Sequence, residues 1–370
     1  MGRGKKAVVR PIDLPPGKRV LVVSDIHGNL PFLKGLLDKV GFSQEDILIL
    51  LGDLVERNEG SLDTLRYVME LSRTHSGVYT LRGNCDDLIV NFVDGDGRLS
   101  DSFFHDRWFS FGERSMLVKM AHLAGRSVET MADYPAARAA IRERFGPELD
   151  FLRGLPHIFI NDHYLFVHGG VPREDRLEEL DAYGVMKNDD FWNQGHSFRR
   201  WVIVGHWPVT LYRTDIPSAK PIVDNRRHII SIDGACSLKW DGQLNALILP
   251  GEPGGEFSYV SYDGFPEMTG LDAQASNPDP INIRYGHTKV EVLKRGEELS
   301  ICRHVETGRE VEILTEYIWE REGETYCEDS TDYLLPVEPG DKLSVVRQIS
   351  DRALCKKDGV TGWYFGRLET

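Results

Sequence analysis

The fold of this chain is decided by the stretch VLVVSDIHGN at residues 20–29, in which a short apolar run stops abruptly at Ser24 and Asp25. The four apolar residues predict a buried strand. Leu30, Leu33 and Leu37 then recur at helical spacing, which predicts an amphipathic helix directly after the strand. A buried strand followed by a helix is the unit from which α/β folds with a parallel sheet are built.

The same alternation of strand and helix continues along the chain. Residues 47–51 and 78–81 are apolar runs, separated by a segment in which Leu62, Leu65 and Met69 recur at helical spacing. Residues 88–155 contain no clear strand and predict a helical insertion. Further strands are expected at residues 164–167, 201–204, 229–232 and 246–249. We therefore predict an α/β fold for the first two thirds of the chain.

Composition shifts divide the chain into segments. Residues 1–19 are basic without an apolar stretch and predict a loose leader, and residues 20–262 form the α/β domain. Residues 263–283 are rich in Asp, Ser, Asn and Pro, which predicts a linker. Residues 284–370 alternate apolar and polar side chains at period two, which predicts a β-rich region.

Charge and cysteine usage exclude several classes of partner. The 370 residues carry a formal net charge of −14, which argues against binding to a nucleic-acid duplex or an anionic membrane. No apolar run reaches the roughly 18 residues that a membrane helix requires. Five scattered cysteines without a CxxC pair are typical of a reducing compartment, so we expect a cytoplasmic location.

Polar side chains follow five of the predicted strands, at the point where each strand ends. In open α/β sheets the functional crevice lies beyond the carboxyl ends of parallel strands, so residues far apart in sequence meet there. We therefore expect these side chains to form one site. They are Asp25, His27, Asp53, Asn84, His168 and His206.

The types of these six side chains predict a pair of metal ions. Three oxygen donors and three imidazoles suit Mn, Fe, Zn or Ni better than Ca or Mg. Six ligands exceed what one ion with an open position uses, whereas two ions about 3.5 to 4 Å apart can share one carboxylate. We predict two divalent ions, with Mn favoured over Fe, Zn and Ni.

Five sequence blocks resemble the signature of the calcineurin-like metallophosphoesterases, closest to the phosphoprotein phosphatase and diadenosine tetraphosphatase branch. The resemblance covers residues 20–249 and implies a four-layer sandwich. It also implies that Asp25, His27 and Asp53 hold the first metal, and that Asp53, Asn84, His168 and His206 hold the second. The blocks are SDIHGN (24–29), GDLVER (52–57), RGNCDD (82–87), VHGGV (167–171) and VGHWPV (204–209).

The resemblance implies hydrolysis of phosphoesters by a metal-bridging hydroxide. Arg57 would bind the substrate phosphate through its planar fork together with Asn84, and Glu56 would support that loop. Pro208 stands where phosphodiesterase branches carry a second histidine. This difference favours a phosphomonoesterase of the Ser/Thr protein phosphatase type, with a phosphoprotein or a nucleotide as substrate.

Two departures from the phosphatase pattern leave alternatives open. Cys85 stands where that branch has the histidine that protonates the leaving group, so the proton donor is either Cys85 or Asp86. The second phosphate-binding arginine is absent, and Lys187, Arg199 and Arg200 are candidates for its role. The alternatives are a hydrolase of dinucleoside polyphosphates or cyclic diesters, and a catalytically weak phosphate-binding scaffold.

The end of the chain resembles an SH3-like barrel. Residues 334–370 contain short alternating strands and the ending GWYFGRL at 362–368. Such barrels bind peptides, and Trp363 and Tyr364 would form an aromatic ledge for a peptide ligand. The alternative is that these aromatic rings pack inward and the barrel is purely structural.

Overall fold

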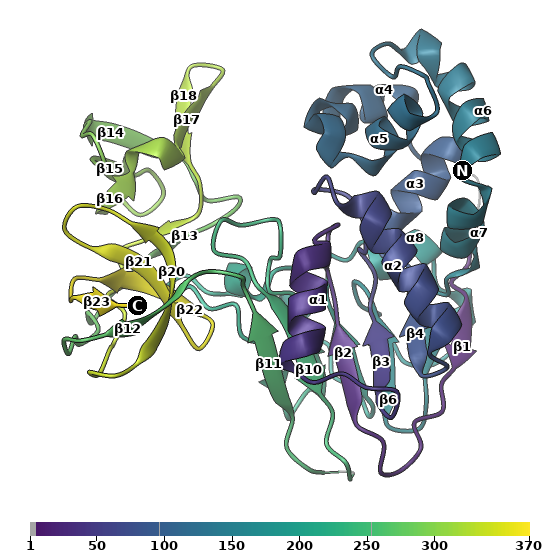
Figure 1. The fold of residues 1–370 in the computed structure, drawn as a ribbon, viewed down its shortest axis with the longest axis horizontal. Coiled ribbons are helices and arrows are strands. Elements are labelled where there is room, and N and C mark those ends of the chain that lie inside the picture. The colour runs from purple at the N-terminus through teal and green to yellow at the C-terminus, as the bar shows by residue number, and fades with distance from the viewer. Residues whose placement is uncertain (1–4, 96, 253) are drawn as a thin grey trace. The chain divides into compact units, whose positions relative to one another are not determined.

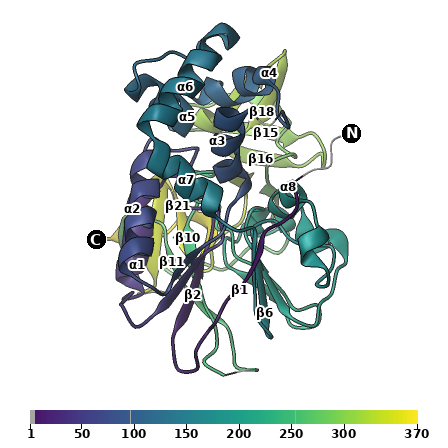
Figure 2. The same ribbon diagram turned by 90° about the vertical axis from the view of Figure 1, so that its right-hand side faces the viewer.

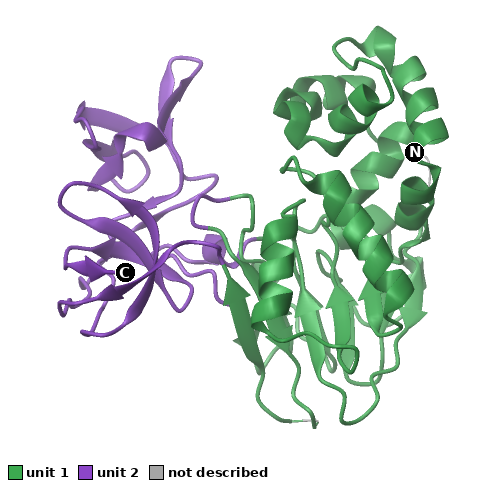
Figure 3. Cartoon of the chain, viewed as in Figure 1, with its two compact units in different colours: residues 1–207, 221–238, 242–262 green, residues 208–220, 239–241, 263–370 purple. Residues whose placement is uncertain are grey.

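The computed structural model describes residues 5–95, 97–252 and 254–370, and it divides into two compact units (Figure 3). Unit 1 comprises Met1–Trp207, Pro221–Leu238 and Gly242–Tyr262. Unit 2 comprises Pro208–Lys220, Lys239–Asp241 and Asp263–Thr370. Residues 1–4 of the predicted leader lie outside the described residues.

The first sheet of unit 1 contains the strand Val20–Val23, which precedes Asp25. Its β2, β3 and β4 are parallel, with Val22 opposite Ile49, whereas β10 runs antiparallel to β2. The predicted runs at residues 20, 47 and 78 are therefore neighbouring strands. The sheet order is β11 (Ser258–Tyr262), β10 (Leu244–Ile248), β2 (Val20–Val23), β3 (Ile47–Leu50) and β4 (Val78–Thr80).

The second sheet of unit 1 collects the later strands. Strands β6, β7 and β9 are parallel, and β5 runs antiparallel to β6. Part of the predicted leader forms β1, which pairs with β5 in parallel. The sheet order is β1 (Val9–Pro11), β5 (Ile158–Ile160), β6 (Tyr164–Val167), β7 (Trp201–Val204), β9 (Ile229–Ser231) and β8 (Ile222–Asp224).

The two sheets of unit 1 pack face to face around a shared apolar core (Figure 2). Val22 and Ile49 from the first sheet meet Phe166 and Ile203 from the second, and all four are fully buried. Helices α1 (Leu30–Lys39) and α2 (Ser61–Thr74) cover the other face of the first sheet, whereas α8 (Ala182–Met186) covers the second. The result is a layered α/β/β/α unit that brings the ends of β2, β3, β6 and β7 to one edge.

The segment predicted as a helical insertion is built from helices and tight turns around an aromatic cluster (Figure 1). Phe92 packs edge-on against Phe104, Phe109 and Tyr134 at ring-centroid distances of 5.0 to 5.4 Å. Its helices are α3 (Asn84–Asp94), α4 (Asp101–Phe103), α5 (Met116–Leu123), α6 (Tyr134–Arg144) and α7 (Gly146–Gly154), with a π turn at Phe104–Trp108 and 3₁₀ turns at Phe109–Arg114 and Met131–Asp133. Among the described residues, no helix has the length and apolar character that crossing a membrane requires.

Unit 2 consists mainly of strands, with 3₁₀ turns at Val209–Tyr212 and Thr315–Tyr317. Its largest sheet has the order β22 (Val360–Tyr364), β21 (Ala353–Lys357), β20 (Lys342–Gln348), β12 (Glu267–Gly270) and β23 (Leu368–Glu369). A three-stranded sheet contains β14 (Val290–Lys294), β15 (Leu299–His304) and β16 (Glu310–Leu314). Two smaller pairs are β13 (Asn282–Ile283) with β19 (Ser330–Thr331), and β17 (Ile318–Arg321) with β18 (Glu324–Cys327).

The SH3-like barrel is not confirmed, because no strand pairing among the described residues closes the five-stranded sheet. The predicted aromatic ledge is wrong. Trp363 and Tyr364 are buried; Trp363 Nε1 donates to the carbonyl of Thr331 at 2.9 Å, and Tyr364 Oη donates to the carbonyl of Asp272 at 2.8 Å. The two rings pack inward, as the alternative interpretation held, because their apolar surface fills the core of unit 2.

Candidate metal centre

The predicted ligands after β2, β3 and β7 lie in strained backbone. Asp25, His27, Asp53 and His206 have φ angles of 57°, 48°, 49° and 65°, in the left-handed region that side chains rarely adopt. Such residues cost about 1 to 3 kcal/mol each and persist where the surrounding structure holds them. Here Asp25 N–H donates to Gly52 C=O at 3.1 Å and His27 N–H donates to Asp53 C=O at 2.9 Å, which joins the two loops.

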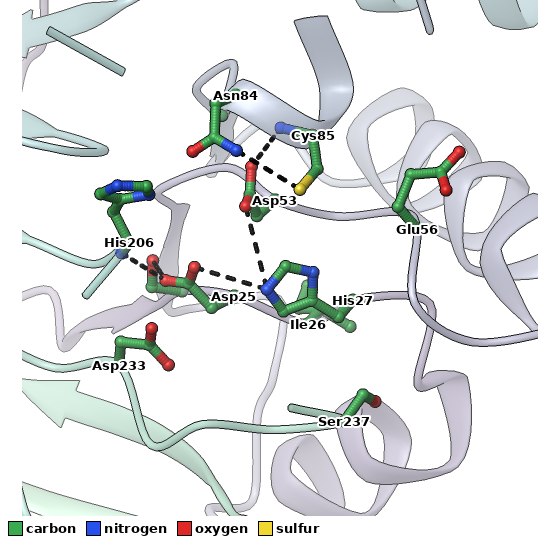
Figure 4. A network of polar contacts seen from close by, with 12 residues as sticks. Asp25, Ile26, His27, Asp53, Glu56, Asn84, Cys85, His206, Asp233 and Ser237 are labelled. Carbon is green, nitrogen blue, oxygen red and sulfur yellow. Dashed lines mark hydrogen bonds and ion pairs between the residues drawn. The ribbon is translucent and has the colours of Figure 1, made fainter. Parts of the chain in front are cut away.

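The structure brings all six predicted ligands together around Asp53. Figure 4 shows Asp53 among these side chains, apart from His168. Asp53 Oδ2 lies 3.8 Å from Nε2 of His27, and its Oδ1 lies 3.3 Å from Nε2 of His168. Nε2 of His168 is also 3.2 Å from Oδ1 of Asn84, and the rings of His168 and His206 are 5.2 Å apart. The two oxygens of Asp53 therefore face two different groups of side chains.

Asp25 completes the group on the His27 side. Its Oδ2 accepts hydrogen bonds from Ser24 Oγ at 2.5 Å and from the backbone N–H of His206 at 2.9 Å. Its Oδ1 lies 3.8 Å from His27 Nε2 and is buried, without a hydrogen-bond partner among the described residues. A buried carboxylate oxygen without a partner is costly unless a cation or another donor meets it.

Glycine is required at two positions beside these carboxylates. A Cβ atom at Gly205 would collide with Ser24 Oγ and Asp25 Oδ2, and one at Gly83 would collide with Asp53 Oδ1. These contacts explain why the strand-end blocks contain glycine next to a ligand: the carboxylates occupy the space that a side chain would fill.

Burial and mutual charge perturb the titration of the ligands. Burial raises the pKa of Asp25 to about 6, with the charge of Asp53 adding to the effect, and burial lowers the pKa of His27 to about 4. Burial opposes the ionised form of Asp53, yet the charges of His168 and His27 hold its pKa well below the usual range. Burial also disfavours the charged form of His168, but Asp53 and Asp25 outweigh it and raise that pKa to about 9. Without a metal, a protonated imidazole balances the carboxylates.

The loop after Asp53 places Glu56 and Arg57 against the helical insertion. Glu56 is fully buried; its Oε1 accepts from the backbone N–H of Met116 at 2.9 Å and from Ser115 Oγ at 3.3 Å. Burial raises the pKa of Glu56 to about 7. The Arg57 guanidinium contacts the rings of Trp108 and Phe111, and no carboxylate among the described residues pairs with it.

The two candidate proton donors lie at the start of α3. The Cys85 thiol is buried, its Sγ lies 3.4 Å from Asn84 Nδ2, and burial raises its pKa. Asp86 uses both carboxylate oxygens to accept from backbone N–H groups, those of Leu54 at 3.0 Å and Gly83 at 2.8 Å. Both oxygens of Asp86 are therefore used to cap backbone N–H groups of the neighbouring loops.

The three candidates for the second phosphate-binding cation lie in different places in the structure. Lys187 lies at the centre, with Nζ 3.4 Å from His206 Nε2 and paired with Asp189. Arg199 and Arg200 instead pair with Glu174, at 3.6 and 3.8 Å, and within the described residues neither forms a hydrogen bond or ion pair with a predicted ligand. Of the three cations, Lys187 is the one that the fold brings to a predicted ligand.

Two acidic residues of the centre were missed by the sequence interpretation. Asp189 Oδ1 lies 2.7 Å from His206 Nε2, and it occurs in an irregular segment without a sequence signal. Asp233 is fully buried beside Asp25 (Figure 4), and the burial raises its pKa. Asp233 follows β9, so the strand-end rule that found the other ligands could have found it.

The residues present fit a pair of divalent cations. His27, Asp53 and Cys85 form one group whose ligand atoms all lie within 4.8 Å of one another, and Asp53, His168 and His206 form a second. Asp53 belongs to both groups. One carboxylate shared by two sets of donors is the arrangement that dinuclear sites require. The α/β/β/α unit and this centre define a metal-dependent hydrolase.

Comparison with known proteins agrees with this class: the chain belongs to the calcineurin-like phosphoesterase family, whose sequence model matches residues 18–231. It is accordingly a phosphoester hydrolase. It is 21% identical over 264 residues to a bis(5'-nucleosyl)-tetraphosphatase (asymmetrical) of Halalkalibacterium halodurans, covering 65% of this chain and 92% of that protein. Over 51 residues it is 53% identical to a symmetrical bis(5'-nucleosyl)-tetraphosphatase of Serratia proteamaculans, covering 14% of this chain and 18% of that protein.

Among solved structures, the chain is similar to a serine/threonine phosphatase of Saccharomyces cerevisiae. The alignment has a TM-score of 0.43 at 13% identity, and it covers 71% of this chain and 85% of that chain.

Proposed function

We propose that this chain hydrolyses dinucleoside polyphosphates, the alternative that the sequence left open beside a protein phosphatase. The observation that carries the proposal is the side chain after Asn84, which is the buried thiol of Cys85. Among the described residues, the imidazoles in contact with the carboxylates of the centre come from His27, His168 and His206, the last through Asp189, and all three are predicted metal ligands. Within the described part of the chain, no further imidazole contacts these carboxylates to serve as a proton donor for a leaving group.

The absence of a spare imidazole matters because leaving groups differ in their need for a proton. A serine or threonine alkoxide is strongly basic and needs a general acid when the phosphoester bond breaks. A nucleotide leaving from a polyphosphate is a phosphate anion, whose last pKa near 6 allows it to depart without protonation at neutral pH. A centre with Cys85 in this position therefore suits an anhydride better than a phosphoprotein. The names of the two curated relatives support the same substrate class.

The roles of the side chains follow from their contacts. Asp25, His27, Asp53, Asn84, His168 and His206 would hold two ions, manganese being the expected metal, and these ions would supply charge neutralisation and an activated water. Arg57 would bind a phosphate group through its in-plane N–H groups. Asn84 would bind the same phosphate. Lys187 would add positive charge near His206.

Substrate preference of the manganese-loaded chain tests the proposal. Diadenosine tetraphosphate, p-nitrophenyl phosphate and a phosphoserine peptide are compared by kcat/KM, with nucleotide products separated by anion exchange. We expect diadenosine tetraphosphate to be preferred by at least about tenfold, which corresponds to about 1.4 kcal/mol of transition-state binding. Asp53→Asn is the inactive control. A clear preference for the phosphoserine peptide would contradict the proposal.

A phosphomonoesterase of the Ser/Thr protein phosphatase type is the second candidate, favoured by Pro208 in place of a second histidine. Cys85→His separates it from the first. If protonation of an alkoxide limits the wild type, the variant hydrolyses the phosphoserine peptide faster while the tetraphosphate rate stays within a few fold. A scaffold that binds phosphate without catalysis would be inert in both forms yet still bind manganese.

A peptide ligand of the C-terminal region and a cytoplasmic location stay predictions. A peptide ligand of residues 334–370 would be detected by screening the full chain for binding to a peptide library. A cytoplasmic location agrees with five free cysteines and would be tested by fractionation.

A further inference from the structure

We infer that Trp108 and Phe111 of the helical insertion are positioning residues that hold the Arg57 guanidinium ready for a phosphate group. This inference rests on the proposed function, in which Arg57 is the cation that binds the substrate phosphate. The helical insertion would then contribute directly to the phosphate-binding site.

The two rings form a corner around the guanidinium. The Arg57 Cζ atom lies 4.7 Å from the centroid of the Trp108 ring and 4.4 Å from that of the Phe111 ring. The rings themselves are 5.7 Å apart and inclined at 86° to each other. Trp108 is only 6% exposed, so this part of the corner is fixed by the insertion core, where Phe103 stacks on it. Both distances lie within the range of a cation–π interaction.

Other contacts fasten the same loop to the insertion. Glu56 accepts from the Met116 N–H at the start of α5, and Lys119 Nζ donates to the carbonyl of Glu59 at 2.8 Å. Glu56 and Arg57 both have left-handed backbone, with φ angles of 74° and 75°. Strained backbone of this kind needs tertiary contacts to hold it. The insertion supplies such contacts on both sides of Arg57.

Among the described residues, no protein group accepts a hydrogen bond from the Arg57 guanidinium, whose Nε is buried. An aromatic ring attracts a guanidinium through its flat face, whereas a phosphate is bound by the N–H groups along its edge. Among the described residues no carboxylate pairs with Arg57, and its Nε has no hydrogen-bond partner. The aromatic corner therefore restrains a flexible cation without neutralising it, which reduces the ordering cost when phosphate binds.

The test measures binding of inorganic phosphate to the manganese-loaded full chain by calorimetry, together with KM and kcat for diadenosine tetraphosphate. The variants are Trp108→Leu and Phe111→Leu, each made alone and combined with Arg57→Ala. Phe109→Leu is the matched control, because Phe109 is a partly buried ring of the same insertion that packs on Phe92 and Tyr134. Thermal melting of every variant reports its folding.

We expect Trp108→Leu and Phe111→Leu to weaken phosphate binding by about tenfold, in line with the strength of a partly buried cation–π contact. Phe109→Leu should leave phosphate affinity unchanged. In the Arg57→Ala background the two leucine substitutions should have no further effect, which a purely structural role would not produce. Unchanged phosphate affinity in Trp108→Leu, or an equal loss with and without Arg57, would overturn the inference. So would a wild type that binds no phosphate.

Failure of the proposed function has a different signature. If the wild type binds phosphate and shows the expected coupling to Arg57 but does not turn over the tetraphosphate, the positioning role stands and the proposed substrate is wrong.

Discussion

The backbone N–H of Cys85 donates a 2.8 Å hydrogen bond to Oδ1 of Asp53, the oxygen that also lies 3.3 Å from His168 Nε2. Cys85 lies in the first turn of α3, where backbone N–H groups have no acceptor within the helix and favour a negative charge. The helix end therefore fixes the orientation of the Asp53 carboxylate. Its other oxygen is thereby directed toward His27.

The shared position of Asp53 predicts that both metal sites depend on it. Asp53→Asn keeps the size of the side chain but removes the charge between the two donor groups. We expect bound manganese to fall from about two ions per chain to one or fewer, and turnover to fall by roughly a hundredfold or more. Elemental analysis after gel filtration measures the stoichiometry. Asp150→Asn, at an exposed site of α7, is the control. Equal stoichiometry in both variants would remove Asp53 from the centre.

Asp189 predicts an effect on metal affinity through His206. Its carboxylate lies 2.7 Å from His206 Nε2 and can fix the ring so that Nδ1 serves as the ligand atom. Asp189→Asn should weaken manganese binding by about 10 to 100-fold in a chelator competition assay. The neighbouring Asp190, which accepts from Asn193 Nδ2, supplies the matched variant Asp190→Asn. An equal response of both variants would show that Asp189 does not orient His206.

The crowding around Gly205 predicts that a larger side chain there lowers both the stability of the fold and the affinity of the centre for manganese. A methyl group there would press on Ser24 and Asp25, and overpacking of this kind costs about 1 to 3 kcal/mol. Gly205→Ala should lower the free energy of unfolding by that amount and weaken manganese binding. At Gly154 an added Cβ meets nothing within 4 Å, so Gly154→Ala is the control. Urea titrations with and without manganese measure both effects, and a stable Gly205→Ala chain with normal metal binding would refute this prediction.

Glu56 predicts a pH dependence of stability. Its pKa is raised from 4.5 to about 7 by burial, so between these values the folded chain keeps a proton that the unfolded chain has released. Raising the pH through this window therefore lowers the free energy of unfolding, by about 3 kcal/mol for this group, and the loss is complete above the folded pKa. Glu56→Gln removes this contribution.

Urea unfolding of the metal-free chain at pH 5 and pH 8 measures the effect. The difference in unfolding free energy between the two pH values should be smaller in Glu56→Gln than in wild type by about 2 to 3 kcal/mol. Glu143→Gln, at an exposed site of α6 with no ion-pair partner among the described residues, should keep the wild-type difference. An identical pH response of wild type and Glu56→Gln would show that Glu56 is ionised in the folded chain.

Much of the centre could be predicted because the ends of its strands have a recognisable sequence pattern. The runs before Asp25, Asp53, His168 and His206 are short, apolar and stopped by glycine-flanked polar residues, and each one is a strand in the structure. Parallel strands end at the same edge, so a local pattern was enough to predict a meeting of distant residues.

The remaining features depend on contacts that no local pattern encodes. Strands β2 and β6 have equally apolar sequences, and periodicity does not say that they belong to two different sheets. Asp189 lies in an irregular segment, and its contact with His206 follows from the path of the chain after α8. For Trp363 and Tyr364 the sequence left a surface ledge and inward packing as alternatives, because alternation in a short strand does not reveal which face is inward.

The most direct test of the account is the anomalous scattering of manganese in crystals of the metal-loaded chain. Two peaks are predicted, both at bonding distance from Asp53, one beside Asp25 and His27 and the other beside His168 and His206. A map without peaks at Asp53, or with manganese bound elsewhere in the chain, would contradict the central claim that these side chains hold a pair of ions.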